Sequence, residues 1–273
     1  MDAPMNTPLH DHSSQAGLDA PLLREDAGGI TFLTLNRPRQ YNALSSALLQ
    51  ALHIELDAIA ADPRVRVVVI TGGGSAFCAG HDLKEMRALG DQSQVAGLFQ
   101  RCSEMMLKIV RLPQPVIAEV NGLATAAGCQ LVAQCDLAVS ADHVKFAVSG
   151  VNLGLFCSTP AVALSRAVSR KRAAEMLFTG DFIDANKALD WGLVNRVVPS
   201  GELRNATLQL AARLIAKPRE ALAMGKALFY RQMEAGLESA YKDASDTITC
   251  NMMLPVAIEG VDAFIQKRPP KWD

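Results

Sequence analysis

The chain has 273 residues, of which 49% are hydrophobic and 20% charged, a composition typical of a globular protein. Its 27 basic and 28 acidic residues leave a formal charge of −1, which gives no reason to expect nucleic acid or a membrane surface as the main partner. The six cysteines include no C-x-x-C pair, so their spacing predicts neither a zinc site nor a disulfide framework.

Residues 1–27 are predicted to form a mobile leader. Residues 1–20 contain no Lys or Arg and no continuous apolar stretch, so they fit neither a secretory signal nor an Arg-rich transit peptide. We therefore expect a cytoplasmic protein in which ordered structure begins near Gly29.

Residues 28–202 are predicted to form an α/β core. Strands are expected at 30–36, at the β-branched run 65–70 and at 116–120, followed by shorter strands at 136–140, 144–147 and 192–198. Helices are expected after Ser45, through about Ala61, and from Ala127 to Gln134. Strand, glycine turn and helix thus alternate, which is the pattern of an α/β fold.

The C-terminal part, residues 203–273, is predicted to be helical. The β-branched runs stop at Leu203, and residues 203–216, 219–235 and 237–250 have a helical pattern of apolar residues. We expect this region to bury apolar surface between subunits, because its apolar side chains lie beyond the α/β core.

Two short turns each follow a predicted strand and open a helix, at residues 75–84 and 121–129. N–H groups at the start of a helix have no partner inside it, so they can meet an anion. One donor from each turn would stabilise a single oxygen that gains charge during a reaction. On spacing alone, the more ordinary interpretation is that both turns are tight strand-to-helix connections.

The same two segments carry a family resemblance. Residues 77–84 (FCAGHDLK) resemble the F-x-A-G-x-D-[IL] signature of the enoyl-CoA hydratase/isomerase (crotonase) superfamily, and residues 115–122 (PVIAEVNG) with Ala127-Gly128-Cys129 resemble its second signature. Four further segments follow in family order: LNRP at 35–38, NAL at 42–44, CDL at 135–137 and ALDWGLV at 188–194. The resemblance covers roughly residues 28–270, and the segment GLFCSTP at 154–160 is similar to one particular branch of the family.

The resemblance implies a spiral core of ββα units and C-terminal helices that form a homotrimer, with trimers commonly pairing into a homohexamer. It implies an acyl-CoA thioester as ligand, with no cofactor besides the coenzyme A of that ligand and no metal. It also assigns the oxyanion hole to the backbone N–H groups of His81 and Ala127.

The sequence departs from the family at both glutamates that hydratases use. Gln130 and Gly150 stand at those positions. A glutamine amide can hold a water but cannot take its proton, and glycine has no side chain, so the ordinary hydratase mechanism is not expected. Four other residues could replace the missing glutamates in catalysis, although a structural role is the more ordinary interpretation of such residues: Glu119, Glu85, Cys157 and Ser158.

The resemblance further implies a surface that binds coenzyme A. The candidates are basic residues and main-chain groups near the turns or in the C-terminal segment: Arg37, Arg39, Ala79, Gly80, Asp82, Leu83, Lys84, Gly128, Phe264 and Lys267. Phosphates of the nucleotide would favour the cations, although isolated basic residues are often simply solvated.

Two classes of function remain open on these residues. One is an acyl-CoA enzyme that carries out hydration, isomerisation or hydrolysis through an oxyanion; the other is a non-catalytic acyl-CoA-binding or regulatory protein. Other motifs fail: Cys78 and His81 are too few ligands for zinc, His81 stands where a phosphate loop needs lysine, and no G-x-S-x-G is present.

Overall fold

The computed structural model describes residues 20–272. A six-stranded sheet has the order β1-β2-β3-β5-β7-β10, and only its first pair is antiparallel. Its strands are β1 (Leu22–Ala27), β2 (Ile30–Leu35), β3 (Val67–Gly72), β5 (Val116–Val120), β7 (Leu137–Ala141) and β10 (Arg196–Val198). β3 and β5 are buried along their whole length, which explains why these strands are rich in Val and Ile.

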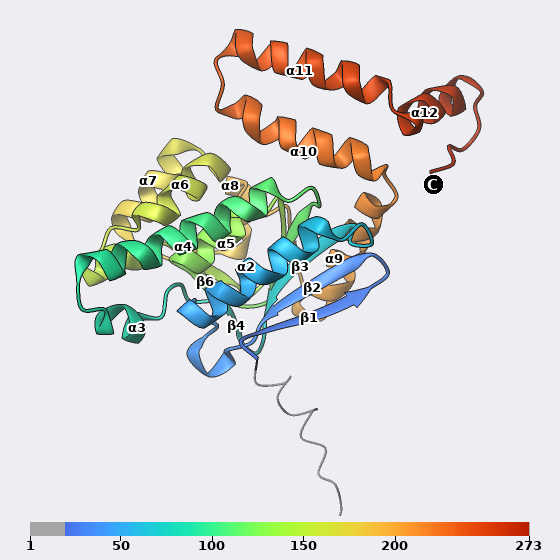
Figure 1. The fold of residues 1–273 in the computed structure, drawn as a ribbon. Coiled ribbons are helices and arrows are strands. Elements are labelled where there is room, and N and C mark those ends of the chain that lie inside the picture. Colours follow the sequence, from blue (N-terminus) through green and yellow to red (C-terminus); the bar gives the residue numbers. More distant parts are fainter. Residues whose placement is uncertain (1–19, 273) are drawn as a thin grey trace, which may run out of the picture.

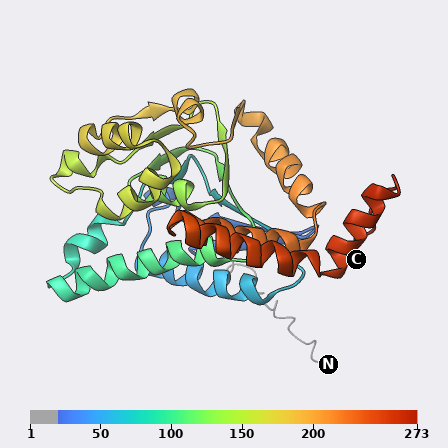
Figure 2. The same ribbon diagram turned by 90° about the horizontal axis from the view of Figure 1, so that it is seen from above.

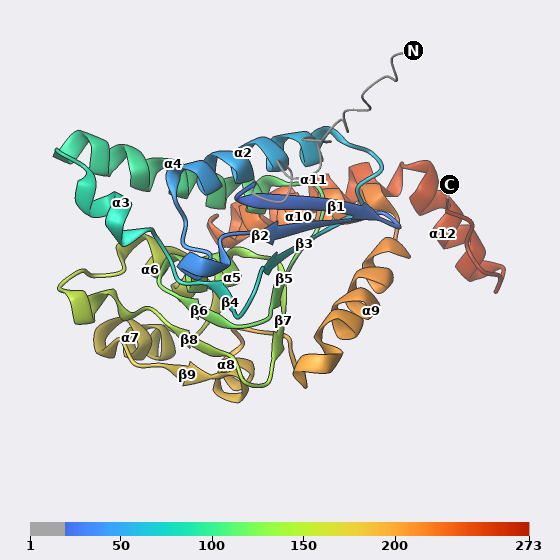
Figure 3. The ribbon, with the colours of Figure 1, turned by 90° about the horizontal axis from the view of Figure 1, so that it is seen from below.

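A second sheet, of four short strands, has the order β4-β6-β8-β9. Its strands are β4 (Ala76–Cys78), β6 (Leu123–Thr125), β8 (Lys145–Ala147) and β9 (Ile183–Asp184). β3, β5 and β7 of the first sheet each lead directly into one of its strands and then into a helix, so the chain repeats a ββα unit (Figure 3). This is the spiral expected from the resemblance.

Helices enclose both sheets. α2 (Ser46–Ala61) and α4 (Gln92–Arg111) pack together on one side of the larger sheet, and α9 (Leu203–Ile215) lies on the other (Figure 3). The remaining helices of the core are α3 (Leu83–Ala88), α5 (Ala127–Gln134), α6 (Ser158–Ala167), α7 (Arg170–Thr179) and α8 (Ala185–Trp191), with 3-10 turns η1 (Pro38–Gln40), η2 (Ser149–Leu153) and η3 (Ser200–Glu202).

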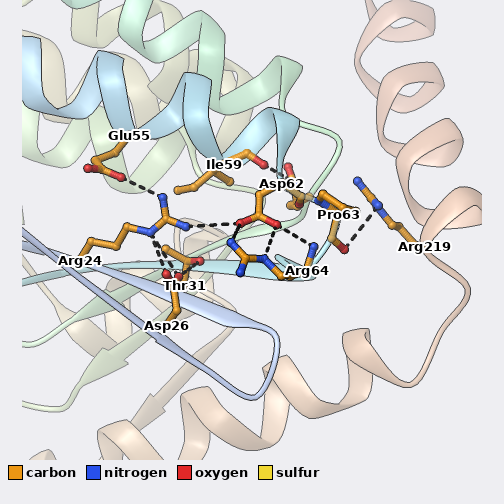
Figure 4. A network of polar contacts seen from close by, with 10 residues as sticks. Arg24, Asp26, Thr31, Glu55, Ile59, Asp62, Pro63, Arg64 and Arg219 are labelled. Atoms are coloured by element: carbon orange, nitrogen blue, oxygen red, sulfur yellow. Dashed lines mark hydrogen bonds and ion pairs between the residues drawn. The ribbon is translucent and has the colours of Figure 1, made fainter.

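Regular structure starts earlier than the sequence predicts. Residues 22–27, assigned to the leader, form β1, which pairs with the whole of β2; residues 1–19 lie outside the described part. Polar contacts hold β1 in place: Arg24 donates to Glu55 of α2 at 3.0 Å, and Asp26 accepts from the Thr31 hydroxyl (Figure 4). The leader prediction missed these contacts because their partners lie up to 31 residues away.

The C-terminal region is helical, as expected, and contains α9, α10 (Arg219–Met233), α11 (Leu237–Met252) and α12 (Pro255–Ile265). α10 is tied to the core by Lys226, whose ammonium donates to Asp136 at 2.7 Å and to the carbonyls of Ile109 and Gln114 at 2.9 Å each. Tyr230 donates to the other oxygen of Asp136.

α11 lies beyond α10, and α12 projects past the end of this pair (Figures 1 and 2). Within residues 20–272 no single helix has the length and apolarity to cross a membrane. α11 and α12 meet that requirement only jointly, and the chain bends by 76° between them.

Candidate functional site

The two glycine turns lie against each other. β4 pairs with β6 in parallel, and the Thr125 hydroxyl donates to the Ala79 carbonyl at 3.0 Å. Gly80 has a φ of +96°, and a Cβ placed on it would be 2.9 Å from the Cβ of Ala126 and 3.2 Å from the nitrogen of Ala127. The fold therefore brings together two segments that are more than 40 residues apart in the sequence.

The N–H groups of His81 and Ala127 both lack an acceptor among the described residues. Leu44 donates to the Gly80 carbonyl at 2.7 Å and accepts from the N–H of Asp82 at 3.3 Å. This bridge uses the residues on either side of His81 and leaves the N–H of His81 itself unused. Ala127 is the first residue of α5, where a helix has no internal acceptor. Two free donors thus lie on adjoining turns.

Close backbone contact leaves no space for larger residues in these turns. A Cβ on Gly128 would lie 2.0 Å from the carbonyl oxygen of Cys78, and one on Gly122 would lie 2.1 Å from that of Ser75. Ala126 adopts φ 48° and ψ −119°, a backbone conformation that is rare for a residue with a side chain, and its N–H donates to Ala147 at 2.9 Å.

Two side chains beside these turns are buried without hydrogen-bond partners within residues 20–272. They are His81, through both ring nitrogens, and Gln130, through Oε1. Burial lowers the pKa of His81, which favours the neutral ring, and the Leu44 main chain and the Glu85 carboxylate offset part of this shift. The edge of the His81 ring meets Phe99 of α4, with centroids 5.3 Å apart.

Gly150 lies in η2, and its surroundings are filled. Its N–H donates to Sγ of Cys157 at 3.3 Å, and its carbonyl accepts from Leu155 at 3.0 Å. A Cβ on Gly150 would be 2.6 Å from the Leu155 oxygen and 2.7 Å from that sulfur. The buried Cys157 therefore has a packing role, and burial raises the pKa of its thiol, which keeps it from acting as a thiolate.

The other proposed substitutes for the missing glutamates have structural partners. Glu119 is 3% exposed and pairs with Arg204 of α9 at 3.1 Å. Glu85 accepts from the N–H of Ser46, the first residue of α2, at 3.0 Å, so its carboxylate caps the start of that helix. Ser158 is exposed, and its hydroxyl contacts the Phe156 carbonyl at 3.3 Å.

The candidates for coenzyme A binding divide into three groups. Arg37 is engaged within the protein, donating to Asp82 at 2.9 Å and to the Ala43 carbonyl at 2.5 Å. This contact lowers the pKa of Asp82, which also caps α3. Arg39, Leu83 and Lys84 are exposed near the turns, and the side chains of Arg39 and Lys84 have no ion pair within the described part of the chain.

Phe264 and Lys267 form the third group, at the C-terminus. Phe264 belongs to α12, which lies at the opposite end of the molecule from α3 (Figures 1 and 3). A single chain therefore does not bring these two residues to the turns. Arg268, next to them, is engaged with Glu259 at 2.6 Å.

Metal chemistry finds no support in the geometry. Within residues 20–272 no three His, Cys, Asp or Glu side chains are grouped to hold an ion. Complete burial raises the pKa of Cys78 to about 12, so this residue of the C-x-x-H pair remains a thiol.

Comparison with known proteins identifies the family of this chain. The model of the enoyl-CoA hydratase/isomerase family matches residues 25–273. The chain belongs to this family. It is 48% identical over 244 residues to enoyl-CoA hydratase domain-containing protein 3, mitochondrial, of Mus musculus, covering 89% of this chain and 81% of that protein.

Two solved structures of the family are closely similar. One is an enoyl-CoA hydratase of Mycobacterium smegmatis, with 57% identity and a TM-score of 0.91, covering 92% of this chain and 98% of that one. The other is human enoyl-CoA hydratase domain-containing protein 3, with 46% identity and a TM-score of 0.89, covering 92% and 100%. These matches confirm the crotonase-type fold and the branch indicated by residues 154–160.

The comparisons contradict the predicted cytoplasmic location. The matching proteins of Mus musculus, Xenopus laevis, Rattus norvegicus, Homo sapiens and Danio rerio all carry the word mitochondrial in their names. The prediction depended on the composition of residues 1–20, most of which lie outside the described residues.

Proposed function

We propose that this enoyl-CoA hydratase-like protein binds an acyl-CoA thioester and holds its carbonyl oxygen with the N–H groups of His81 and Ala127. The observation that carries this proposal is the pair of free donors on adjoining turns. The two turns are in close contact, because a Cβ built on Gly80 would lie 3.2 Å from the Ala127 nitrogen. Two fixed donors stabilise the charge that grows on the oxygen when the thioester becomes an enolate.

Ordinary hydration of an enoyl thioester is not part of the proposal. It requires a group that takes a proton from water and another that supplies one to the α-carbon. Gln130 carries an amide instead of a carboxylate, and Gly150 has no side chain. Glu119 is paired with Arg204, and Glu85 accepts a hydrogen bond from the start of α2. We expect crotonyl-CoA turnover below the usual range of about 1–10³ per second.

The deciding experiment measures binding of butyryl-CoA and of a CoA analogue that mimics the enolate. Ala127→Pro removes one donor at the first residue of α5, so we expect the folded variant to bind the analogue about a hundredfold more weakly. Arg170→Pro makes the same change at the exposed first residue of α7 and should leave binding unchanged. Thermal unfolding verifies that both variants are folded.

Two results would count against this function. If the unmodified protein binds no acyl-CoA at millimolar concentration, the site is wrong. If Ala127→Pro folds and binds the enolate mimic as tightly as the parent, the oxyanion is held elsewhere.

A second candidate, a non-catalytic acyl-CoA-binding or regulatory protein, is favoured by one observation. Leu155 and Cys157 fill the space beside Gly150, so a side chain with catalytic capacity has no room there. The two candidates share the same binding site. Proton exchange at the α-carbon of butyryl-CoA in D₂O separates them, because an enzyme that forms the enolate exchanges this proton and a passive binder does not.

We also propose that the C-terminal helices join copies of the chain into a homotrimer or a pair of trimers. α11 has no buried residue, and this region exposes Phe264 (84%), Leu237 (76%) and Met253 (73%). Apolar area of this kind is typical of subunit interfaces. Light scattering should return three or six times the chain mass of 29.2 kDa, and a monomer at micromolar concentration would contradict the proposal.

A further inference from the structure

Residues 37–44 form a loop that packs against the first glycine turn, and we call this loop the clasp. Three backbone hydrogen bonds join the two segments, from Ala79 to the Tyr41 carbonyl at 3.0 Å, from Leu44 to the Gly80 carbonyl at 2.7 Å and from Asp82 to the Leu44 carbonyl at 3.3 Å. These bonds lie before and after His81 in the chain. The clasp therefore fixes the peptide groups on both sides of one proposed oxyanion donor.

Asn42 is the buried centre of the clasp, with 0% of its surface exposed. Its Oδ1 accepts from the N–H of Arg37 at 2.9 Å, which closes the clasp on itself. Its Nδ2 donates to the carbonyls of Gly73 at 2.9 Å and Ala76 at 2.7 Å, so both amide hydrogens are used. One side chain thus joins the clasp to the segment that leads into the first turn.

The backbone of the clasp is held in a conformation that its residues rarely adopt. Tyr41 has a φ of 50° and Asn42 a φ of 55°, both in the left-handed region. Asparagine tolerates this region better than most residues, but tyrosine does not. The Tyr41 ring is 58% exposed, so packing of the ring does not explain its conformation. The hydrogen bonds of Asn42 and of the Tyr41 carbonyl hold the two residues there.

The two proposed donors depend on the clasp to different degrees. Ala127 is the first residue of α5, so the helix itself sets the direction of its N–H. His81 precedes Asp82, the N-cap of α3, and forms only an isolated bridge with Leu44 of the clasp. The direction of the His81 N–H therefore follows from where the clasp places Leu44.

We propose that Asn42 is a positioning residue, which acts through the clasp to direct the N–H of His81 toward the thioester oxygen. This inference rests on the proposed function, because it takes the His81 N–H as one of the two oxyanion donors. It gives a physical role to the segment NAL at 42–44, which the sequence marks only through a resemblance.

The test uses Asn42→Gly, which permits the positive φ and removes only the side-chain hydrogen bonds. Titration calorimetry measures the dissociation constants of butyryl-CoA and of the enolate-mimicking CoA analogue. We expect the analogue to bind about tenfold more weakly and butyryl-CoA at most about twofold, because a misdirected donor matters most for a charged oxygen. A merely structural role would lower stability and leave the ratio of the two constants unchanged. Asn42→Asp keeps the size and the acceptor but not the two donors, so it should shift the ratio as well.

Asn195→Ala is the matched control. Asn195 also holds backbone through its side chain, accepting from the N–H of Ala138 in β7 at 2.7 Å, outside both turns. Its loss should lower stability and leave the ratio equal to that of the parent. A milder test is Arg37→Met, because the Arg37 guanidinium ties the clasp to the turn through Ala43 and Asp82. It should shift the ratio in the same direction by a smaller factor, and it decides the question if neither Asn42 variant folds.

Amide hydrogen exchange gives a second measurement that needs no ligand. The amides of Leu44 and Ala79 donate the bonds of the clasp, so in Asn42→Gly they should exchange at least about tenfold faster while those of α10 keep the rate of the parent. An unchanged ratio or unchanged exchange in a folded Asn42 variant overturns this inference alone. Failure of the parent to bind either ligand overturns the proposed function and this inference together.

Discussion

The adjoining turns around Gly80 and Gly128 and the loop from Gly150 to Cys157 are both too crowded for an added Cβ, but for opposite reasons. In the turns, main chain packs on main chain, and the result is two N–H groups without acceptors. In the loop, the chain folds back on Gly150, and the sulfur of Cys157 accepts its N–H. Crowding leaves two donors free in one place and fills the space beside Gly150 in the other.

This difference separates two parts of the family's chemistry. The proposed oxyanion stabilisation needs only backbone N–H groups, so a change of side chain such as the histidine at position 81 does not forbid it. Acid–base catalysis needs particular side chains, and the loop has lost the space for one of them. Under the proposed function, the chain keeps the fold of its family and the thioester contacts without the ordinary hydratase reaction.

Gly128→Ala should have the largest effect on stability. The added Cβ would meet the Cys78 carbonyl at 2.0 Å, and backbone on both sides must move. We expect a loss of about 3 kcal/mol or more in the free energy of unfolding, measured by urea denaturation. Gly225→Ala is the control, because nothing lies within 4 Å and alanine in the middle of α10 should stabilise by about 0.5–1 kcal/mol. Equal stability of the two variants would mean that the turns do not touch.

The comparison also shows which parts of the fold follow from sequence. The β-branched strands β3 and β5 and the bounds of α2 and α5 agree with prediction, because periodicity and caps such as Ser45 are local signals. β1 was missed because its polar residues are held by α2 and β2, contacts that no local pattern reveals.

The same distinction holds for the site. The motifs located both turns, but no local pattern shows that Cys157 fills the space beside Gly150 or that Glu85 caps a helix 39 residues away. These contacts arise from the folding of the loop and from packing between elements. The unpartnered ring of His81 was missed for the same reason, since burial of a polar atom depends on what surrounds it.

Restoring both family glutamates tests the closed loop directly. In Gln130→Glu with Gly150→Glu, the second side chain has no room, so we expect a loss of about 1–3 kcal/mol in stability and no gain of crotonyl-CoA hydration. Gly201→Glu is the matched control, because Gly201 has nothing within 4 Å, and its stability should stay within about 0.5 kcal/mol of the parent. Hydration by the double variant at about 1 per second or faster would show that the loop opens easily and that the space is available.

The smallest expected effect is a difference in cysteine labelling rates between the turns and the loop. Of the six cysteines only Cys250 is exposed, so iodoacetamide should modify it first. Burial raises the pKa of Cys78 and Cys129 to about 12 and raises that of Cys157 as well. A raised pKa leaves little reactive thiolate, so these thiols should react only when the surrounding structure opens.

The order among the buried thiols then reports which region opens more readily. The loop around Cys157 exposes Leu153, Leu155 and Phe156, so few buried contacts resist its opening. In a Cys250→Ser background, mass spectrometry should therefore find Cys157 modified before Cys78 and Cys129, which are fully buried between the turns. Butyryl-CoA should slow the modification of Cys78 and Cys129 further, because a ligand held by the turns stabilises them. If Cys129 reacts as fast as Cys157, the turns are no more rigid than the loop, and a fixed pair of oxyanion donors is the wrong description of this site.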